Sequence, residues 1–193
     1  MKIYTRTGDK MKTTTFKGQV YKSDLVIEVE GTLDEATTVL AFARANNTDK
    51  DIKDILEKLI NKMFVFGSEF LGYTSNKLTS NDTLELENII DEYSEKMEKN
   101  NDFIVPGQNV RSASIHLART TIRRLERRVV AYYREYEDER NDTLLMFINR
   151  ISDLLFILGK WEDLHQWLII MFKYGILLFL FQLALLLILL LWQ

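Results

Sequence analysis

The chain lacks cysteine entirely and has one proline and two histidines among its 193 residues. Without cysteine it forms neither disulfides nor thiolate metal sites, and its redox compartment stays open. Its net charge of −3 gives no overall basic field that would attract nucleic acid. The first 22 residues are polar and do not resemble a signal peptide, so we expect a cytoplasmic protein.

The single proline divides the chain where its most informative helix begins. Pro106-Gly107 cannot lie inside a helix, so it marks a turn, and the next helix is predicted from near Asn109 to about Tyr136. Apolar residues at spacings of three and four predict that one face of this helix packs on a core. They are Ile115, Ala118, Ile122, Leu125 and Val129.

Three arginines lie beside that apolar stripe on the same helix. Arg119, Arg123 and Arg127 recur every four residues, which spreads them over roughly 12 Å. Each guanidinium group can donate two parallel hydrogen bonds to phosphate oxygens, so the spacing suits a polyphosphate. Glu126 lies among them and can orient one arginine. Spacing alone leaves a solvated basic helix face as the alternative.

Four other segments have helical periodicity, and short loops connect them. Thr32, with Glu35 three residues later, is predicted to cap the first helix, which ends near Asn46. The others are predicted at 51–73, at 82–99 and from Asp142 onward. Five helices with short connections predict an all-α antiparallel five-helix bundle.

The C-terminal segment has a different character. Residues 174–192 contain no charged residue and, at about 29 Å as a helix, are long enough to cross a bilayer. Three explanations remain open for this tail: a membrane anchor, an apolar helix packed in an oligomer, or a frameshifted reading of the original C-terminus. We therefore separate a domain at 1–163 from an atypical hydrophobic tail at 164–193.

Five motifs, in order along the chain, carry a family resemblance. They are TRTGDK at 5–10, GTLDE at 31–35, FIVPG at 103–107, LARTTIRRLER at 117–127 and NRISDLLF at 149–156. Together they resemble the PduO-type ATP:cob(I)alamin adenosyltransferases. The resemblance implies a ferritin-like helical bundle, a homotrimer, and transfer of the 5′-deoxyadenosyl group of ATP to cob(I)alamin. It also implies Mg²⁺ with the ATP, a cob(II)alamin reductase as electron donor, and a B12-dependent acceptor enzyme for the product.

The same resemblance assigns roles to individual residues. Residues 1–30 become the ATP-binding loop and 32–163 the bundle, although composition alone would favour a frayed N-terminus. The implied catalytic residues are Arg123, Arg127, Asp34, Glu126 and Asp153. The implied ATP-binding residues are Thr5, Arg6, Thr7, Gly8, Thr13, Thr14, Lys22, Arg123, Arg127 and Asn149.

Some implied roles have a structural alternative. Asp34 would pair with Arg123 and align subunits, or its negative charge would only interact favourably with the helix dipole. Asn149 and Asp153 share a helix face, where the carboxylate can hold an arginine of the neighbouring helix. Phe103 would lie against the corrin and exclude the lower axial ligand of cobalt. Alternatively, it would only form a hydrophobic staple at the start of the following helix. The histidine on that helix, His116, is not expected to bind cobalt, because this chemistry needs the lower face free.

The chain also departs from the family pattern in its N-terminal loop. Met11 stands where the family has glycine, Lys17-Gly18 is all that remains of a glycine-rich stretch, and the arginine usual before Glu28 is missing. If position 11 needs a positive φ, methionine is strained there and ATP binding is weakened. Two other functions therefore stay open. One is a non-catalytic ATP or corrinoid carrier. The other is a membrane-anchored helical interaction protein whose arginine face meets an acidic partner or lipid head groups.

Overall fold

The computed structural model describes most of the chain. Outside the described residues are 1, 3, 5, 7, 16–17, 74, 98–104 and 192–193, and the side chains of 166–174 and 176–191. The described part consists of five helices and a two-stranded sheet: β1 (Lys12–Thr15), β2 (Gly18–Tyr21), α1 (Leu25–Asn46), α2 (Lys50–Phe70), α3 (Ser80–Glu95), α4 (Val110–Glu135) and α5 (Asp142–Leu191). A short 3₁₀ turn, η1 (Glu137–Glu139), connects α4 to α5. This confirms the predicted helical fold, while the antiparallel hairpin was not predicted.

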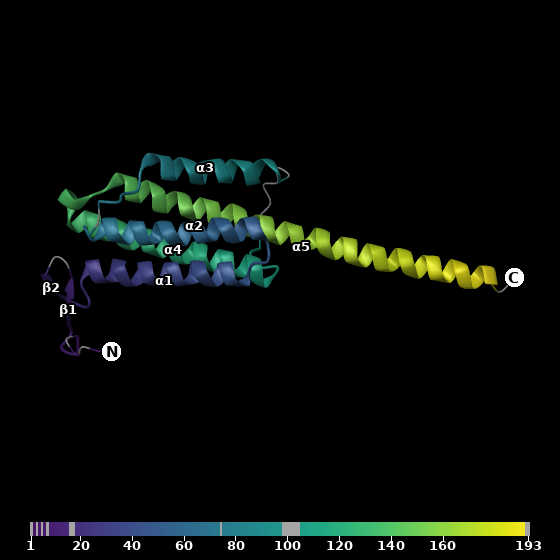
Figure 1. Ribbon diagram of the computed structural model, residues 1–193, viewed down its shortest axis with the longest axis horizontal. Coiled ribbons are helices and arrows are strands. Elements are labelled where there is room, and N and C mark those ends of the chain that lie inside the picture. The colour runs from purple at the N-terminus through teal and green to yellow at the C-terminus, as the bar shows by residue number, and fades with distance from the viewer. Residues whose placement is uncertain are drawn as a thin grey trace.

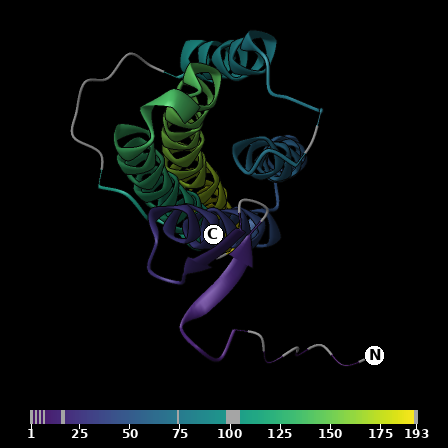
Figure 2. The same cartoon turned by 90° about the vertical axis from the view of Figure 1, so that its left-hand side faces the viewer.

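Consecutive helices run in opposite directions along the bundle (Figure 1). Seen end-on, α1 and α3 lie on opposite sides, and α4 packs against both α1 and α5 (Figure 2). The core fills the space between the helices with large side chains such as Phe66, Phe147 and Ile148, all 0% exposed. The apolar stripe predicted on α4 is fully buried. The apolar residues at the same spacing on α5 are also buried: Leu144, Ile148, Ile151, Leu155 and Leu158.

The predicted start of the first helix was wrong. α1 begins at Leu25 after Asp24, and Thr32 lies inside it, where its hydroxyl donates to the Glu28 carbonyl at 2.6 Å. The buried side chains of Val26 and Val29 extend the core-facing stripe N-terminal to Thr32, so packing continues the helix through the apparent capping box.

The other helix boundaries are set by local hydrogen bonds. Asn109 caps α4 as predicted, its side chain accepting from the Ser112 backbone N–H at 2.9 Å. In α3 the cap is Thr79, with Asp82 three residues later completing a capping box, so the helix begins earlier than predicted. α5 starts at Asp142, as predicted from the sequence.

The fifth helix extends far beyond the other four. It runs for 50 residues without a break, through the point where the composition changes, and projects past the end of the bundle (Figure 1). Among the described residues, no helix combines the length and the hydropathy needed to cross a bilayer. The side chains of 174–192, on which the anchor hypothesis rests, lie outside those described.

Candidate functional site

The arginines of α4 separate into two groups. Arg124 forms an ion pair with Glu35 of α1. Arg128 lies 3.5 Å from the carboxylate of Glu28, which is also on α1. Three arginines lie beside the apolar stripe: Arg119, Arg123 and Arg127. None of them has a carboxylate within ion-pair distance among the described residues. α4 therefore presents one row of neutralised arginines and one row whose charges are available to an anion.

Arg119 is the most constrained of the available arginines. Its Nε is buried and has no hydrogen-bond partner among the described residues, and its guanidinium carbon lies 5.8 Å from the ring centre of Phe156. Burial lowers the pKa of Arg119, and the nearby charge of Arg123 lowers it further. A buried donor without a partner costs free energy, and a bound anion would supply the missing acceptor.

Asn149 and Glu126 lie beside this row. The Asn149 side-chain amide donates to the Glu126 carboxylate at 2.9 Å, which connects α5 to α4. Among the described residues the partner of Glu126 is this amide and not an arginine, so its role in orienting an arginine stays a prediction. The hydrogen bond fixes the Asn149 amide at the edge of the arginine row, where it can contact a nucleotide.

Asp153 belongs to a different network. It was predicted to hold an arginine from the neighbouring helix, but its partner is Arg150 of its own helix, at 2.7 Å. Arg150 also contacts Glu87 of α3 at 2.9 Å. Asp153 faces the side of α5 that adjoins α3, and its role with Arg150 as support for the site stays a prediction.

These charged groups surround an open cavity of about 500 Å³ between α3 and α5. Phe156, 40% exposed, lines it and also contacts Arg119, so one aromatic ring connects the cavity to the arginine row. Phe156 ends the NRISDLLF motif at 149–156, but the sequence gives it no role, because Leu-Leu-Phe looks like an ordinary core segment. Its exposure makes it a candidate site residue.

Asp34 is exposed on α1 and makes no ion pair with Arg123 within the described part of the chain. Its neighbour Glu35 instead binds Arg124. The proposed contact between Asp34 and Arg123 therefore is not formed within one chain, and its role between subunits stays a prediction.

The N-terminal segment brings some of its predicted ATP-binding residues together. A Cβ atom on Gly8 would lie 3.1 Å from the Nζ atom of Lys22, so this ammonium group stands directly over the glycine. Thr13 and Thr14 belong to β1, paired with Val20 and Gln19 of β2. Thr5 and Thr7, and the predicted corrin contact Phe103, lie outside the described residues.

Two non-glycine residues of this segment have left-handed backbone conformations. Met11 has φ of +62°, and Arg6 has φ of +60°. The condition set from the sequence, that position 11 needs a positive φ, is therefore confirmed. Such a conformation costs about 1–3 kcal/mol for a residue with a Cβ, and 73% of the Met11 surface is exposed, so few contacts compensate.

The hairpin and the C-terminal part of the arginine row lie toward the same end of the bundle. The hairpin lies beside the end where α1 begins (Figure 1). Arg128, next to Arg127, lies 3.5 Å from Glu28 in the first turn of α1.

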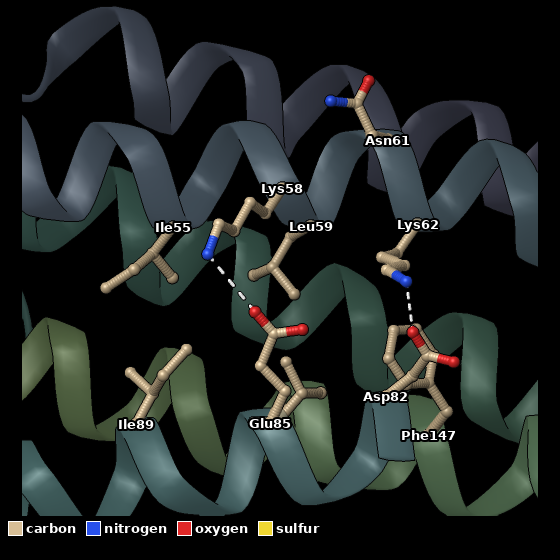
Figure 3. Close-up of a pocket in the computed structure, with 10 residues that line it drawn as sticks. Ile55, Lys58, Leu59, Asn61, Lys62, Asp82, Glu85, Ile89 and Phe147 are labelled. Atoms are coloured by element: carbon tan, nitrogen blue, oxygen red, sulfur yellow. Dashed lines mark hydrogen bonds and ion pairs between the residues drawn. The ribbon is translucent and has the colours of Figure 1, made fainter. Parts of the chain in front are cut away.

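A second hollow of about 250 Å³ lies between α2 and α3 (Figure 3). Lys58 binds Glu85 across it at 3.2 Å, and Lys62 binds Asp82. Its lysines are therefore already neutralised, and none of the predicted site residues lines it. The available positive charge is on α4, so we place the candidate site there. No group of three histidine, aspartate or glutamate side chains within the described residues can hold a metal ion.

Comparison with known proteins gives consistent matches over most of the chain. Residues 3–162 match a family model described as cobalamin adenosyltransferase. The chain is 33% identical to a corrinoid adenosyltransferase of Citrobacter freundii, over 84% of this chain and 95% of that protein. It is 34% identical to a corrinoid adenosyltransferase of Bacillus subtilis (strain 168), over 83% of this chain and 86% of that protein.

A solved structure matches with a TM-score of 0.77 and 29% identity, covering 84% of this chain and 93% of the other. It is a variant PduO-type ATP:corrinoid adenosyltransferase from Lactobacillus reuteri, complexed with cobalamin and ATP.

Proposed function

Because this chain belongs to the cobalamin adenosyltransferase family, we propose that it transfers the 5′-deoxyadenosyl group of ATP to cob(I)alamin, giving adenosylcobalamin and triphosphate. The observation that carries the proposal is the row of three arginines on α4 that have no carboxylate partner within the described part of the chain. They offer a polyanion binding surface in a chain whose net charge is −3.

The chemistry fits a site without a protein nucleophile. The cobalt(I) centre supplies the electron pair, a cobalt–carbon bond forms at C5′, and the C5′–O bond breaks, so the triphosphate leaves with that bonding pair. The cobalamin is itself the reacting group, so the protein has to position ATP and stabilise the charge of the departing triphosphate. Arginines at fixed spacing do both.

The residues of the site divide this work. Arg123 and Arg127 bind the triphosphate, and Arg119 adds a third guanidinium group beside Phe156. Asn149, fixed by Glu126, contacts the nucleoside. Asp153 and Arg150 support the wall of the adjoining cavity. Phe103 lies against the corrin, where it excludes the lower ligand of cobalt and eases reduction of cob(II)alamin.

The N-terminal segment completes the ATP site from a neighbouring subunit. It contributes backbone N–H groups and side chains from these residues: Thr5, Arg6, Thr7, Gly8, Thr13, Thr14 and Lys22. Asp34 is exposed and makes no ion pair with Arg123 among the described residues of one chain, which supports a homotrimer in which Asp34 of one subunit pairs with Arg123 of the next. Sedimentation velocity should give about three times the 22.7 kDa of one chain, and a monomer mass would contradict this assembly.

We infer that Mg²⁺ reaches the site bound to ATP and is not held by the protein alone. The described residues provide no carboxylate cage for it, and Mg²⁺ in nucleotide sites is commonly bound through the substrate phosphates and retained water. A cob(II)alamin reductase and a B12-dependent acceptor enzyme would precede and follow this step.

An anaerobic assay tests the reaction. Purified full-length chain is mixed with ATP and chemically reduced cobalamin, and the cobalt–carbon product is followed by its visible spectrum. Product formation above a protein-free control supports the enzyme. ATP and corrinoid binding without product would support the carrier hypothesis and contradict catalysis.

The left-handed backbone at position 11 gives a separate prediction. We expect Met11→Gly to lower the KM for ATP about 5-fold, because glycine adopts φ of +62° without the Cβ penalty of about 1 kcal/mol. The KM for cobalamin should stay within about 2-fold. Met11→Ala is the matched control, since it shortens the side chain and keeps the strain. An equal gain in both variants would show that the side chain, and not the backbone, limits ATP binding.

A further inference from the structure

The turn before α4, residues 105–109, is tied to α5 by two hydrogen bonds. The Gln108 backbone N–H donates to Asp163 Oδ1 at 3.0 Å, and the Asn109 side-chain amide donates to the Glu162 main-chain carbonyl at 3.0 Å. Asp163 is only 5% exposed. The turn is therefore held by a buried carboxylate that is more than 50 residues away in sequence.

The second carboxylate oxygen of Asp163 faces the interior. It lies 3.4 Å from the Nε2 atom of His116, which is 6% exposed. The ring fits there because residue 159 is glycine: a Cβ atom on Gly159 would lie 2.7 Å from the ring. Neither this oxygen nor either ring nitrogen makes a hydrogen bond with the described residues. Among the described residues, the one hydrogen bond of Asp163 is the bond that it accepts from the Gln108 backbone N–H.

The adjacent buried acid, Glu162, has a different environment. Its two oxygens accept from Arg111 Nε and from the Asn47 amide, both at 2.8 Å, so its charge is compensated. No arginine or lysine pairs with Asp163 among the described residues. A buried carboxylate with so little compensation is costly for a position that only fills space. The hydrogen bond that Asp163 accepts from the Gln108 N–H is the contact that distinguishes it from a residue that only fills space.

We propose that Asp163 is a positioning residue for the corrin, which acts by fixing the turn that follows Phe103. The turn begins two residues after Phe103 in the sequence. The hydrogen bond to the Gln108 N–H sets where this turn lies against α5, and thereby sets the end of the segment that carries the phenylalanine. This inference rests on the role proposed above for Phe103.

A nearly isosteric pair of substitutions separates positioning from packing. Asp163→Leu fills the buried volume but accepts no hydrogen bond, whereas Asp163→Asn keeps an oxygen that can accept from Gln108. We expect Asp163→Leu to raise the KM for cobalamin about 10-fold, the lower end for loss of a hydrogen bond to a charged acceptor. The KM for ATP should stay within about 2-fold, and Asp163→Asn should restore most of the corrin affinity.

Two controls make the test specific. Asp142→Asn removes an exposed carboxylate from the first residue of α5, where it pairs with Arg140, and should leave both KM values unchanged. Circular dichroism checks the fold, and Asp163→Ala replaces the leucine variant if that variant does not fold. Equal losses in the leucine and asparagine variants, or an equal rise in the KM for ATP, would overturn the proposal.

A double-mutant cycle with Phe103→Ala connects Asp163 to the phenylalanine. If Asp163 acts through this segment, Asp163→Leu should cause no further loss of corrin affinity in the Phe103→Ala background. Additive losses would overturn the proposed path through Phe103. If Phe103→Ala alone leaves corrin kinetics unchanged, the role proposed for Phe103 fails, and that result is distinct from a failure at Asp163.

Discussion

Replacing Arg127 by alanine should lower kcat/KM for ATP about 100-fold while the helical circular dichroism signal stays unchanged. A hydrogen bond to a charged group contributes about 1.5–3 kcal/mol, which corresponds to about 10- to 150-fold in rate. The effect should lie mainly in kcat, because the negative charge to be stabilised develops as the triphosphate leaves. Arg123→Ala should behave in the same way. The fold should survive because neither arginine has a carboxylate partner among the described residues.

The chain provides a matched control for this prediction one residue away. Arg128 has the same side chain on the same helix, but its guanidinium group faces Glu28 of α1 at 3.5 Å. That pair is about half exposed on both sides, so its loss should change stability by less than about 1 kcal/mol. We expect Arg128→Ala to retain activity within about 3-fold. Equal losses in Arg127→Ala and Arg128→Ala would show that net positive charge, and not the unpaired row, serves the reaction.

Features decided within a few residues could be predicted from the sequence. The start of α4 at Asn109 depends on a hydrogen bond to Ser112, three residues away, and both residues can be seen in the sequence. The arginine row is also local, since four-residue spacing alone places its members on one face. Thr32 was mispredicted because the same three-residue pattern also occurs inside helices, and the buried Val26 and Val29 decide between the two.

Partners across the bundle could not be predicted in the same way. Asn149 and Asp153 lie on one face of α5, yet the first reaches Glu126 of α4 and the second pairs with Arg150 toward α3. A small rotation of the helix decides this division, and the rotation depends on how all the neighbouring side chains pack. The contact between Asp163 and the turn before α4 joins residues 55 positions apart, so no local pattern indicates it.

Two phenylalanines of α2 give the second large expected effect, this time on stability. Phe66 is 0% exposed in the core, whereas Phe64, two residues earlier, is 65% exposed. Phe66→Ala removes a fully buried ring and leaves a cavity, so it should lower the free energy of unfolding by about 3–5 kcal/mol. Phe64→Ala makes the same chemical change at the surface and should cost less than about 0.5 kcal/mol.

Urea denaturation followed by circular dichroism, at one fixed protein concentration, measures both values. The concentration is held constant because subunit association stabilises the folded state by mass action. Phe66 continues the helical spacing of apolar residues from Ile52 through Met63, which predicts a core position, whereas Phe64 does not. A large loss at both positions would show that the exposed face of α2 is also buried, in a contact between subunits. A small loss at Phe66 would contradict the packing of the bundle itself, because no other mechanism protects a fully buried aromatic ring from truncation.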